Sequence, residues 1–240
     1  LELNLNPPTA WLAEHPDEVV KIASGDANYP SIGSRAWVDA AKTRLAALIE
    51  HLRQSGAIEG VTGITLTALE DGYWYRADGY DSSTAGTASF REWLTRRYAG
   101  DDALRASWGE AEGSLDAAAV PARTADADDG ATFFALPAER RWVDYLRYVS
   151  EATADVIAEF ATHVKSLTGP SFLVYAPYGF GLELSQNDAG HFALINLIDS
   201  DIDGFISPLP TLERGLGTPG GLTAVVGFGA MLTASLEWAL

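Results

Sequence analysis

The sequence contains no cysteine among its 240 residues, which excludes disulfide bonds, thiol nucleophiles and cysteine-bound zinc. Histidine is also scarce. His15, His51, His163 and His191 lack the i, i+4 or short-loop spacing that brings ligands onto one metal ion. We therefore expect no metal site and no cofactor. No apolar run approaches the roughly 20 residues needed to span a bilayer, so neither a transmembrane segment nor a membrane partner is expected.

Basic residues are few, with 16 Lys and Arg against 33 Asp and Glu, and the net charge is −17. A nucleic-acid partner is not expected, because affinity for a phosphate backbone depends on clustered Lys and Arg. The acidity suits a neutral substrate, or a proteome adapted to high salt or acid. The opening LELNLN is neither a basic nor an apolar signal-peptide segment, so no signal peptide is expected and the compartment stays open.

Apolar residues are plentiful, at 47% of the chain, and predict one soluble domain over residues 1–240. Short apolar runs alternate with segments of helical periodicity. The expected strands are 1–5, 61–69, 172–175 and 202–207, with a final apolar run at 234–240. A short helix is expected to begin near Pro16. Further helices are expected at 37–52, 90–98, 101–108, 137–167, 191–198 and 223–232. Loops are expected at 24–34 and 109–130.

This alternation is typical of an α/β protein with a parallel sheet, specifically a (β/α)8 TIM barrel. Only about five strands can be counted, so the barrel is expected to be incomplete at both ends of this chain. In such barrels the functional site lies at the carboxyl ends of the strands. Asn6, Glu70, Tyr178 and Ser207 fall at or just after the ends of predicted strands.

One stretch, Ile64 to Tyr80, brings an acid and aromatic rings together. Its apolar run ends at Glu70, Asp71 and Gly72 then break regular pairing, and Tyr73, Trp74 and Tyr75 follow. Sugar rings stack on aromatic faces, while their hydroxyls and glycosidic oxygens need acids and amides. The pattern therefore favours a sugar site, although Glu70 could equally cap an ordinary strand end and the aromatic rings could simply pack.

Two helical segments resemble a known family. FREWLTRRYAG at 90–100, followed by DDALRASWG at 101–109, is similar to the F-x-x-W-L-x-x-[KR]-Y-G-x-x-x-x-L-N-x-x-W-G stretch of clan A glycoside hydrolases. The nearest resemblance is to the family 42 β-galactosidases and their uncharacterised relatives. WLAEHPD at 11–17 and the segment 145–161 also resemble parts of that family. The resemblance implies that this chain runs from the third to the seventh barrel strand.

The resemblance also implies roles for individual residues. Glu70 matches the general acid/base carboxylate at the end of the fourth strand, although Leu69 stands where the family usually has Asn. The nucleophile belongs at the end of the seventh strand, which should be the final apolar run. Glu237 is the only acid in that run, and the true nucleophile could instead follow Leu240. Trp74 and Tyr178 are predicted to stack on the sugar, with Asn6 and Ser207 as further substrate-binding residues.

The predicted function is that of a retaining glycoside hydrolase acting on β-glycosidic bonds, with a carbohydrate substrate. This fragment by itself is expected to be inactive, and the full-length protein could form a homo-oligomer. The alternative is a non-catalytic carbohydrate-binding or scaffold protein with a degenerate barrel. That alternative is motivated by Leu69 and by the unassigned nucleophile. A Glu or Asp encoded shortly after Leu240 would favour the enzyme.

Overall fold

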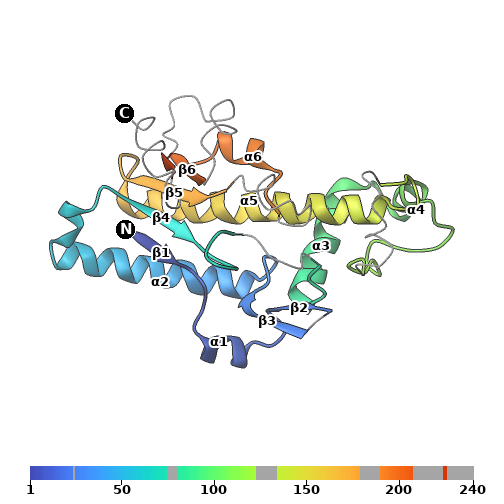
Figure 1. The fold of residues 1–240 in the computed structure, drawn as a ribbon, viewed down its shortest axis with the longest axis horizontal. Coiled ribbons are helices and arrows are strands. Elements are labelled where there is room, and N and C mark those ends of the chain that lie inside the picture. Colours follow the sequence, from blue (N-terminus) through green and yellow to red (C-terminus); the bar gives the residue numbers. More distant parts are fainter. Residues whose placement is uncertain (24, 75–79, 123–133, 179–189, 208–223, 226–240) are drawn as a thin grey trace, which may run out of the picture.

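The computed structural model describes residues 1–23, 25–74, 80–122, 134–178, 190–207 and 224–225. Its centre is a five-stranded sheet in the order β1-β4-β5-β6-β7 (Figure 1). Every neighbouring pair in this sheet is parallel, so the carboxyl ends of all five strands lie at one edge. The strands are Glu2–Asn4, Gly63–Thr67, Leu173–Pro177, Gly204–Ser207 and Ala224–Val225. The predicted α/β class with a parallel sheet is confirmed, while closure into a barrel stays a prediction.

Two long helices, α2 (Arg35–Gln54) and α5 (Arg140–Thr168), pack against the sheet and against each other. Helix α2 begins where the Ser34 hydroxyl accepts a hydrogen bond from the Trp37 amide, as a helix N-cap should. Its buried face and that of α5 form the main core with the apolar side chains of β4 and β5. These side chains are Trp37, Val38, Leu45, Ile49, Ile64, Leu66, Ile157, Phe160, Val164 and Val174.

The shorter elements lie around this centre (Figure 1). They are α1 (Thr9–Glu14), the 3-10 turn η1 (Ala57–Gly60), α3 (Thr84–Arg97), α4 (Asp101–Trp108) and α6 (Leu194–Ile198). Helices α3 and α4 contact the amino-terminal half of α5, which extends beyond the sheet in Figure 1. The helices predicted at 37–52, 90–98, 101–108 and 137–167 are therefore confirmed.

Three predictions of secondary structure were wrong. No helix begins at Pro16. Instead, β2 (Val19–Ile22) pairs antiparallel with β3 (Gly25–Pro30). Strand β3 lies inside the segment 24–34, which was predicted to be a loop. The buried β-branched side chains of Val19 and Val20 favour a strand over the helix start that Pro16 suggested. The helix predicted at 191–198 is present as α6, which begins three residues later. Finally, Ala224 and Val225 form β7 beside β6 in a segment predicted to be helical.

A second aromatic core joins α3 and α4 to α5. It contains the family-like residues of the two helical segments, namely Phe90, Trp93, Leu94, Leu104 and Trp108, together with Tyr145, Tyr148 and Val149 of α5. Phe90 contacts Tyr145 edge-on at a ring-centroid distance of 5.2 Å. The segments that carry the resemblance therefore build the packing of α3 and α4 on α5.

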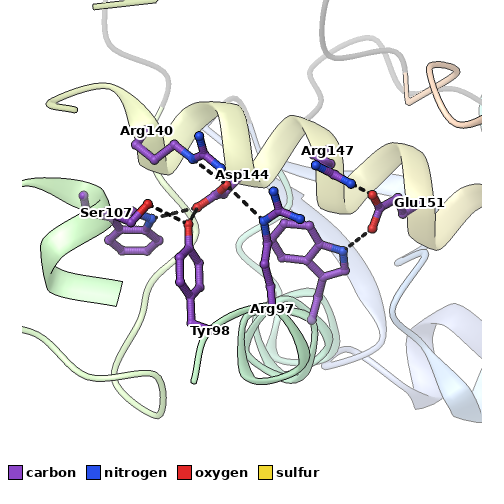
Figure 2. A network of polar contacts seen from close by, with 9 residues as sticks. Arg97, Tyr98, Ser107, Arg140, Asp144, Arg147 and Glu151 are labelled. Carbon is purple, nitrogen blue, oxygen red and sulfur yellow. Dashed lines mark hydrogen bonds and ion pairs between the residues drawn. The ribbon is translucent and has the colours of Figure 1, made fainter. Parts of the chain in front are cut away.

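A buried carboxylate, Asp144, fixes the polar side of this second core (Figure 2). Its Oδ2 accepts hydrogen bonds from the Tyr98 hydroxyl and, at 2.9 Å, from Trp108 Nε1. Its Oδ1 lies 3.0 Å from Arg140 Nε and 3.7 Å from Arg97 Nε. Nearby, Glu151 accepts from Trp93 Nε1 and pairs with Arg147. These polar contacts join α3, α4 and the residues that follow α3 to the amino-terminal half of α5.

Candidate active site

Glu70 lies at the carboxyl edge of the sheet, three residues after β4 ends at Thr67. Strand β4 lies between β1 and β5, so Glu70 follows an interior strand. Its side chain is half-buried, and the hydroxyl of Tyr29 lies 3.5 Å from its Oε2. Tyr29 comes from β3, so the β2–β3 hairpin brings a phenol to this carboxylate. Sequence reasoning placed Tyr29 in a loop and gave it no role, because nothing local signals this long-range contact.

The loop that carries Glu70 has an unusual backbone. Leu69, Asp71 and Trp74 have φ angles of 61°, 51° and 60°, in the left-handed region that side chains other than glycine rarely adopt. Such conformations cost on the order of 1–3 kcal/mol each and persist where surrounding contacts enforce them. Here the Trp74 amide donates to Ala68 O at 2.9 Å, and the Tyr73 amide donates to Glu70 O at 3.0 Å. The loop is therefore folded tightly back on the end of β4.

Asn6 contacts this loop from the end of β1. Its Oδ1 accepts from the Leu69 amide, and its Nδ2 donates to Leu69 O, both at 2.8 Å. The sequence predicted that Asn6 binds substrate, yet the two polar ends of its side chain already bind the backbone. Asn6 therefore holds the loop in which Glu70 lies, a role that residue type alone did not reveal.

His191 holds the loop from its other end. Burial lowers the pKa of His191 to about 4, opposed by hydrogen bonds to the backbone of Trp74 and Tyr73. Its ring stacks on Tyr178 with centroids 4.6 Å apart. His191 is therefore a neutral side chain that links the segment before α6 to the loop after β4. The sequence offered no spacing pattern that could have identified it.

The two predicted sugar-stacking residues are core residues in the structure. Trp74 is 0% exposed, packs beside Trp37 and Phe160, and donates from Nε1 to Leu66 O. Tyr178 is also 0% exposed, and its hydroxyl accepts from the Ala193 amide at 3.1 Å. Stacking on a sugar requires an open ring face, so both predictions were wrong. Burial also raises the pKa of the Tyr178 hydroxyl.

Ser207 and Glu237 are the remaining predicted site residues. Ser207 is the last residue of β6, at the same edge of the sheet as Glu70. Glu237 lies outside the described residues. Strand β6 pairs with Ala224–Val225, and the final apolar run that contains Glu237 stays a prediction.

The described residues offer no sign of a metal centre or a membrane span. No group of three or more His, Asp and Glu side chains within these ranges is arranged to hold a metal ion. Of the helices described, none combines the length and the apolar character needed to cross a bilayer.

No protein-family model matches the chain, and no curated protein matches it. Solved structures match in fold. The β-galactosidase from psychrophilic Marinomonas ef1 aligns with a TM-score of 0.62 at 17% identity, over 87% of this chain and 30% of that chain. The β-galactosidase from the Antarctic haloarchaeon Halorubrum lacusprofundi gives 0.57 at 18%, over 89% and 28%. The catalytic domain of a β-amylase from Paenibacillus polymyxa gives 0.56 at 17%, over 86% and 57%.

These similarities confirm the predicted resemblance to β-galactosidases at the level of the fold. The chain spans less than a third of the length of the two β-galactosidases. Because a β-amylase also shares the fold, the fold leaves the sugar and the linkage open. What the chain itself contributes is a carboxylate held at the carboxyl edge of a parallel sheet by a strained loop.

Proposed function

We propose that this chain is part of a retaining glycoside hydrolase that cleaves β-glycosidic bonds, with Glu70 as the general acid/base. The observation that carries the proposal is the place of Glu70, just beyond the carboxyl end of an interior strand in a fold shared with β-galactosidases. In barrels of parallel strands, the chemistry takes place at this edge. The strained loop adds support, since backbone strain concentrates at functional sites.

In this mechanism Glu70 first protonates the oxygen of the leaving group while a second carboxylate attacks the anomeric carbon. Glu70 then removes a proton from water as water attacks the glycosyl-enzyme intermediate. Glu70 therefore acts as an acid in the first step and as a base in the second. The hydroxyl of Tyr29 can donate a hydrogen bond to the ionised carboxylate of Glu70 in the second step.

The second carboxylate would lie roughly 5–5.5 Å from Glu70. Glu237 remains one candidate, and a Glu or Asp encoded after Leu240 is the other. A carboxylate that follows the strand next to β6 would lie at the same edge of the sheet as Glu70. The substrate is a carbohydrate, and a β-galactoside is the first one to test because β-galactosidases share the fold.

A carbohydrate-binding protein without catalysis is the second candidate function. Leu69 stands where clan A enzymes usually have Asn, and Trp74 and Tyr178 are buried rather than open to a sugar. A barrel that has lost part of its sugar site could still bind glycans through other residues.

Hydrolysis by the protein encoded by the complete gene separates the two functions. A panel of nitrophenyl glycosides, with β-galactosides first, is assayed for the wild type, Glu70→Ala and Glu59→Ala. Glu59 is an exposed carboxylate in η1, at the amino end of the same strand, so its loss controls for the removal of one charge. The enzyme proposal expects loss of turnover in Glu70→Ala alone. Sugar binding without any cleavage by the wild type would support the binding protein instead.

A further inference from the structure

The hydrogen-bond ladder between β1 and β4 ends in an unusual way. Its backbone pairs are Glu2 with Thr65, Leu3 with Leu66 and Asn4 with Thr67, followed by a 2.7 Å bond from the Leu5 amide to Thr67 O. The carbonyl of Leu5, the residue after β1, accepts from Trp37 Nε1, while the Leu69 amide donates to Asn6 Oδ1. Pro7 has no N–H to donate. The backbone of β1 therefore cannot continue the ladder as far as Leu69.

The side chain of Asn6 supplies the missing pair of hydrogen bonds. Its amide presents one acceptor and one donor to the Leu69 backbone, as a peptide group in a neighbouring strand would. Pro7 favours this geometry, because a residue before proline is held in an extended conformation. The Asn6 backbone amide itself donates to Asn4 Oδ1 at 2.9 Å, which helps to fix its position.

This side-chain pairing acts on the residue directly before Glu70. Leu69 adopts a φ of 61°, and the Asn6 contacts hold both its N–H and its C=O in that conformation. The left-handed turn at Leu69 sets the direction in which the chain leaves β4, and with it the position of the Glu70 carboxyl beside Tyr29. We propose that Asn6 is a positioning residue, which fixes the direction of Glu70 by replacing the last backbone rung between β1 and β4.

The inference rests on the proposed function for its catalytic consequence. The two hydrogen bonds between the Asn6 side chain and the Leu69 backbone, here called the clamp, can be tested without activity. The clamp differs from the role as a substrate ligand that the sequence suggested for Asn6. A ligand contributes mainly to substrate affinity, whereas a positioning residue contributes to turnover. The two roles therefore predict different kinetic defects.

The first test compares Asn6→Asp and Asn6→Ala with the wild type by thermal unfolding between pH 3 and pH 8. When protonated, the carboxyl group introduced by Asn6→Asp can donate to Leu69 O and accept from the Leu69 amide. When ionised, it faces that carbonyl with a negative charge. The folded-state pKa of this carboxyl is thus raised above its unfolded value of about 3.9. The stability that it adds is then present below that value and is lost as pH rises through the folded pKa.

We expect Asn6→Asp to melt near the wild type at pH 3 and well below it at pH 7, with Asn6→Ala lowered by the same amount throughout. Tyr29, Glu70, Asp71, Tyr73 and His191, the titratable side chains on the segments around this contact, are present in all three proteins, and Asn6→Ala gives the pH dependence without an added carboxyl group. Asn4→Asp is the matched control, because a carboxylate there still accepts from the Asn6 amide. A pH-independent loss in Asn6→Asp would overturn the proposed clamp.

Amide hydrogen exchange at Leu69 gives a second measurement that does not depend on activity. Exchange should rise about tenfold in Asn6→Ala, as expected from the loss of one hydrogen bond, and stay unchanged in Asn4→Asp. Unchanged exchange in Asn6→Ala would also contradict the clamp.

Kinetics then test the catalytic consequence. A misplacement of Glu70 by about 1 Å should lower kcat about 100-fold while KM changes by less than about threefold. A raised KM with unchanged kcat would show that Asn6 binds substrate and would refute its positioning role. If the wild type hydrolyses no glycoside, the proposed function fails, and the unfolding and exchange experiments still decide whether the clamp exists.

Discussion

Replacement of Asp144 by Ala should destabilise the protein far more than the loss of an exposed carboxylate. The side chain of Asp144 is 0% exposed and accepts from Tyr98 and Trp108 while facing Arg140 and Arg97. Removing one partner of a buried ion pair costs about 3–5 kcal/mol, because the remaining groups stay desolvated without a counter-charge. At about 2–4 °C per kcal/mol for a chain of this size, Tm should fall by roughly 6–20 °C.

Asp144→Asn refines this prediction, since it keeps the shape and one carbonyl oxygen but removes the charge. It should cost about 1–1.5 kcal/mol for each of the hydrogen bonds from Tyr98 and Trp108, the difference between a hydrogen bond to a charged group and one to a neutral group. The control is Asp102→Ala, whose carboxylate is 96% exposed and pairs with Arg105 one turn away. That change should cost less than about 1 kcal/mol. Urea denaturation followed by tryptophan fluorescence measures all three, and a cost below about 1 kcal/mol for Asp144→Ala would refute the reasoning.

Two further predictions concern pH. Arg35 and Lys42 lower the pKa of Glu159 to about 2, so the stability that this carboxylate adds should be lost as pH falls from 4.5 towards 2. The free energy of unfolding, measured by urea denaturation, should fall by about 1–2 kcal/mol over this range, after allowance for solvent screening of a side chain that is 30% exposed. Glu159→Gln should abolish this pH dependence. Burial lowers the pKa of His191 from 6.5 to about 4, so folding should weaken by up to about 3 kcal/mol as pH falls between those values. His191→Gln should remove that slope, and an unchanged slope would contradict the buried neutral imidazole.

The parts of the fold that were predictable from the sequence are those with long periodic patterns. Helices α2 and α5 bury apolar side chains at helical spacing over many turns, which leaves little ambiguity. The β2–β3 hairpin was missed because its strands are short and its polar residues, such as Asp26 and Asn28, are also typical of loops. In short strands the pairing partner decides the structure, and that partner is not visible locally.

The candidate site shows the same division. The position of Glu70 after a buried strand was predicted correctly, because a run of apolar residues ending in an acid is a local signal. The burial of Trp74 was not predictable, since the left-handed turns at Leu69, Asp71 and Trp74 direct its ring back into the core. The pairing of Asn6 with Leu69 joins residues from two different strands, which the sequence alone does not bring together.

The resemblance at 90–109 likewise has a structural explanation. Its aromatic and apolar residues pack α3 and α4 against α5, and Tyr98 and Trp108 bind the buried Asp144 (Figure 2). A segment can therefore identify a fold through the demands of packing without containing any residue of the site.

Azide rescue of Glu70→Ala tests the central claim most directly. With the protein encoded by the complete gene and an activated nitrophenyl β-galactoside, the variant should form a glycosyl-enzyme intermediate that water attacks slowly without a general base. Added azide needs no general base, so turnover should recover and a β-galactosyl azide should accumulate. If Glu70→Ala retains wild-type turnover, or if azide neither raises turnover nor forms a glycosyl azide, Glu70 is not the acid/base of a retaining glycosidase.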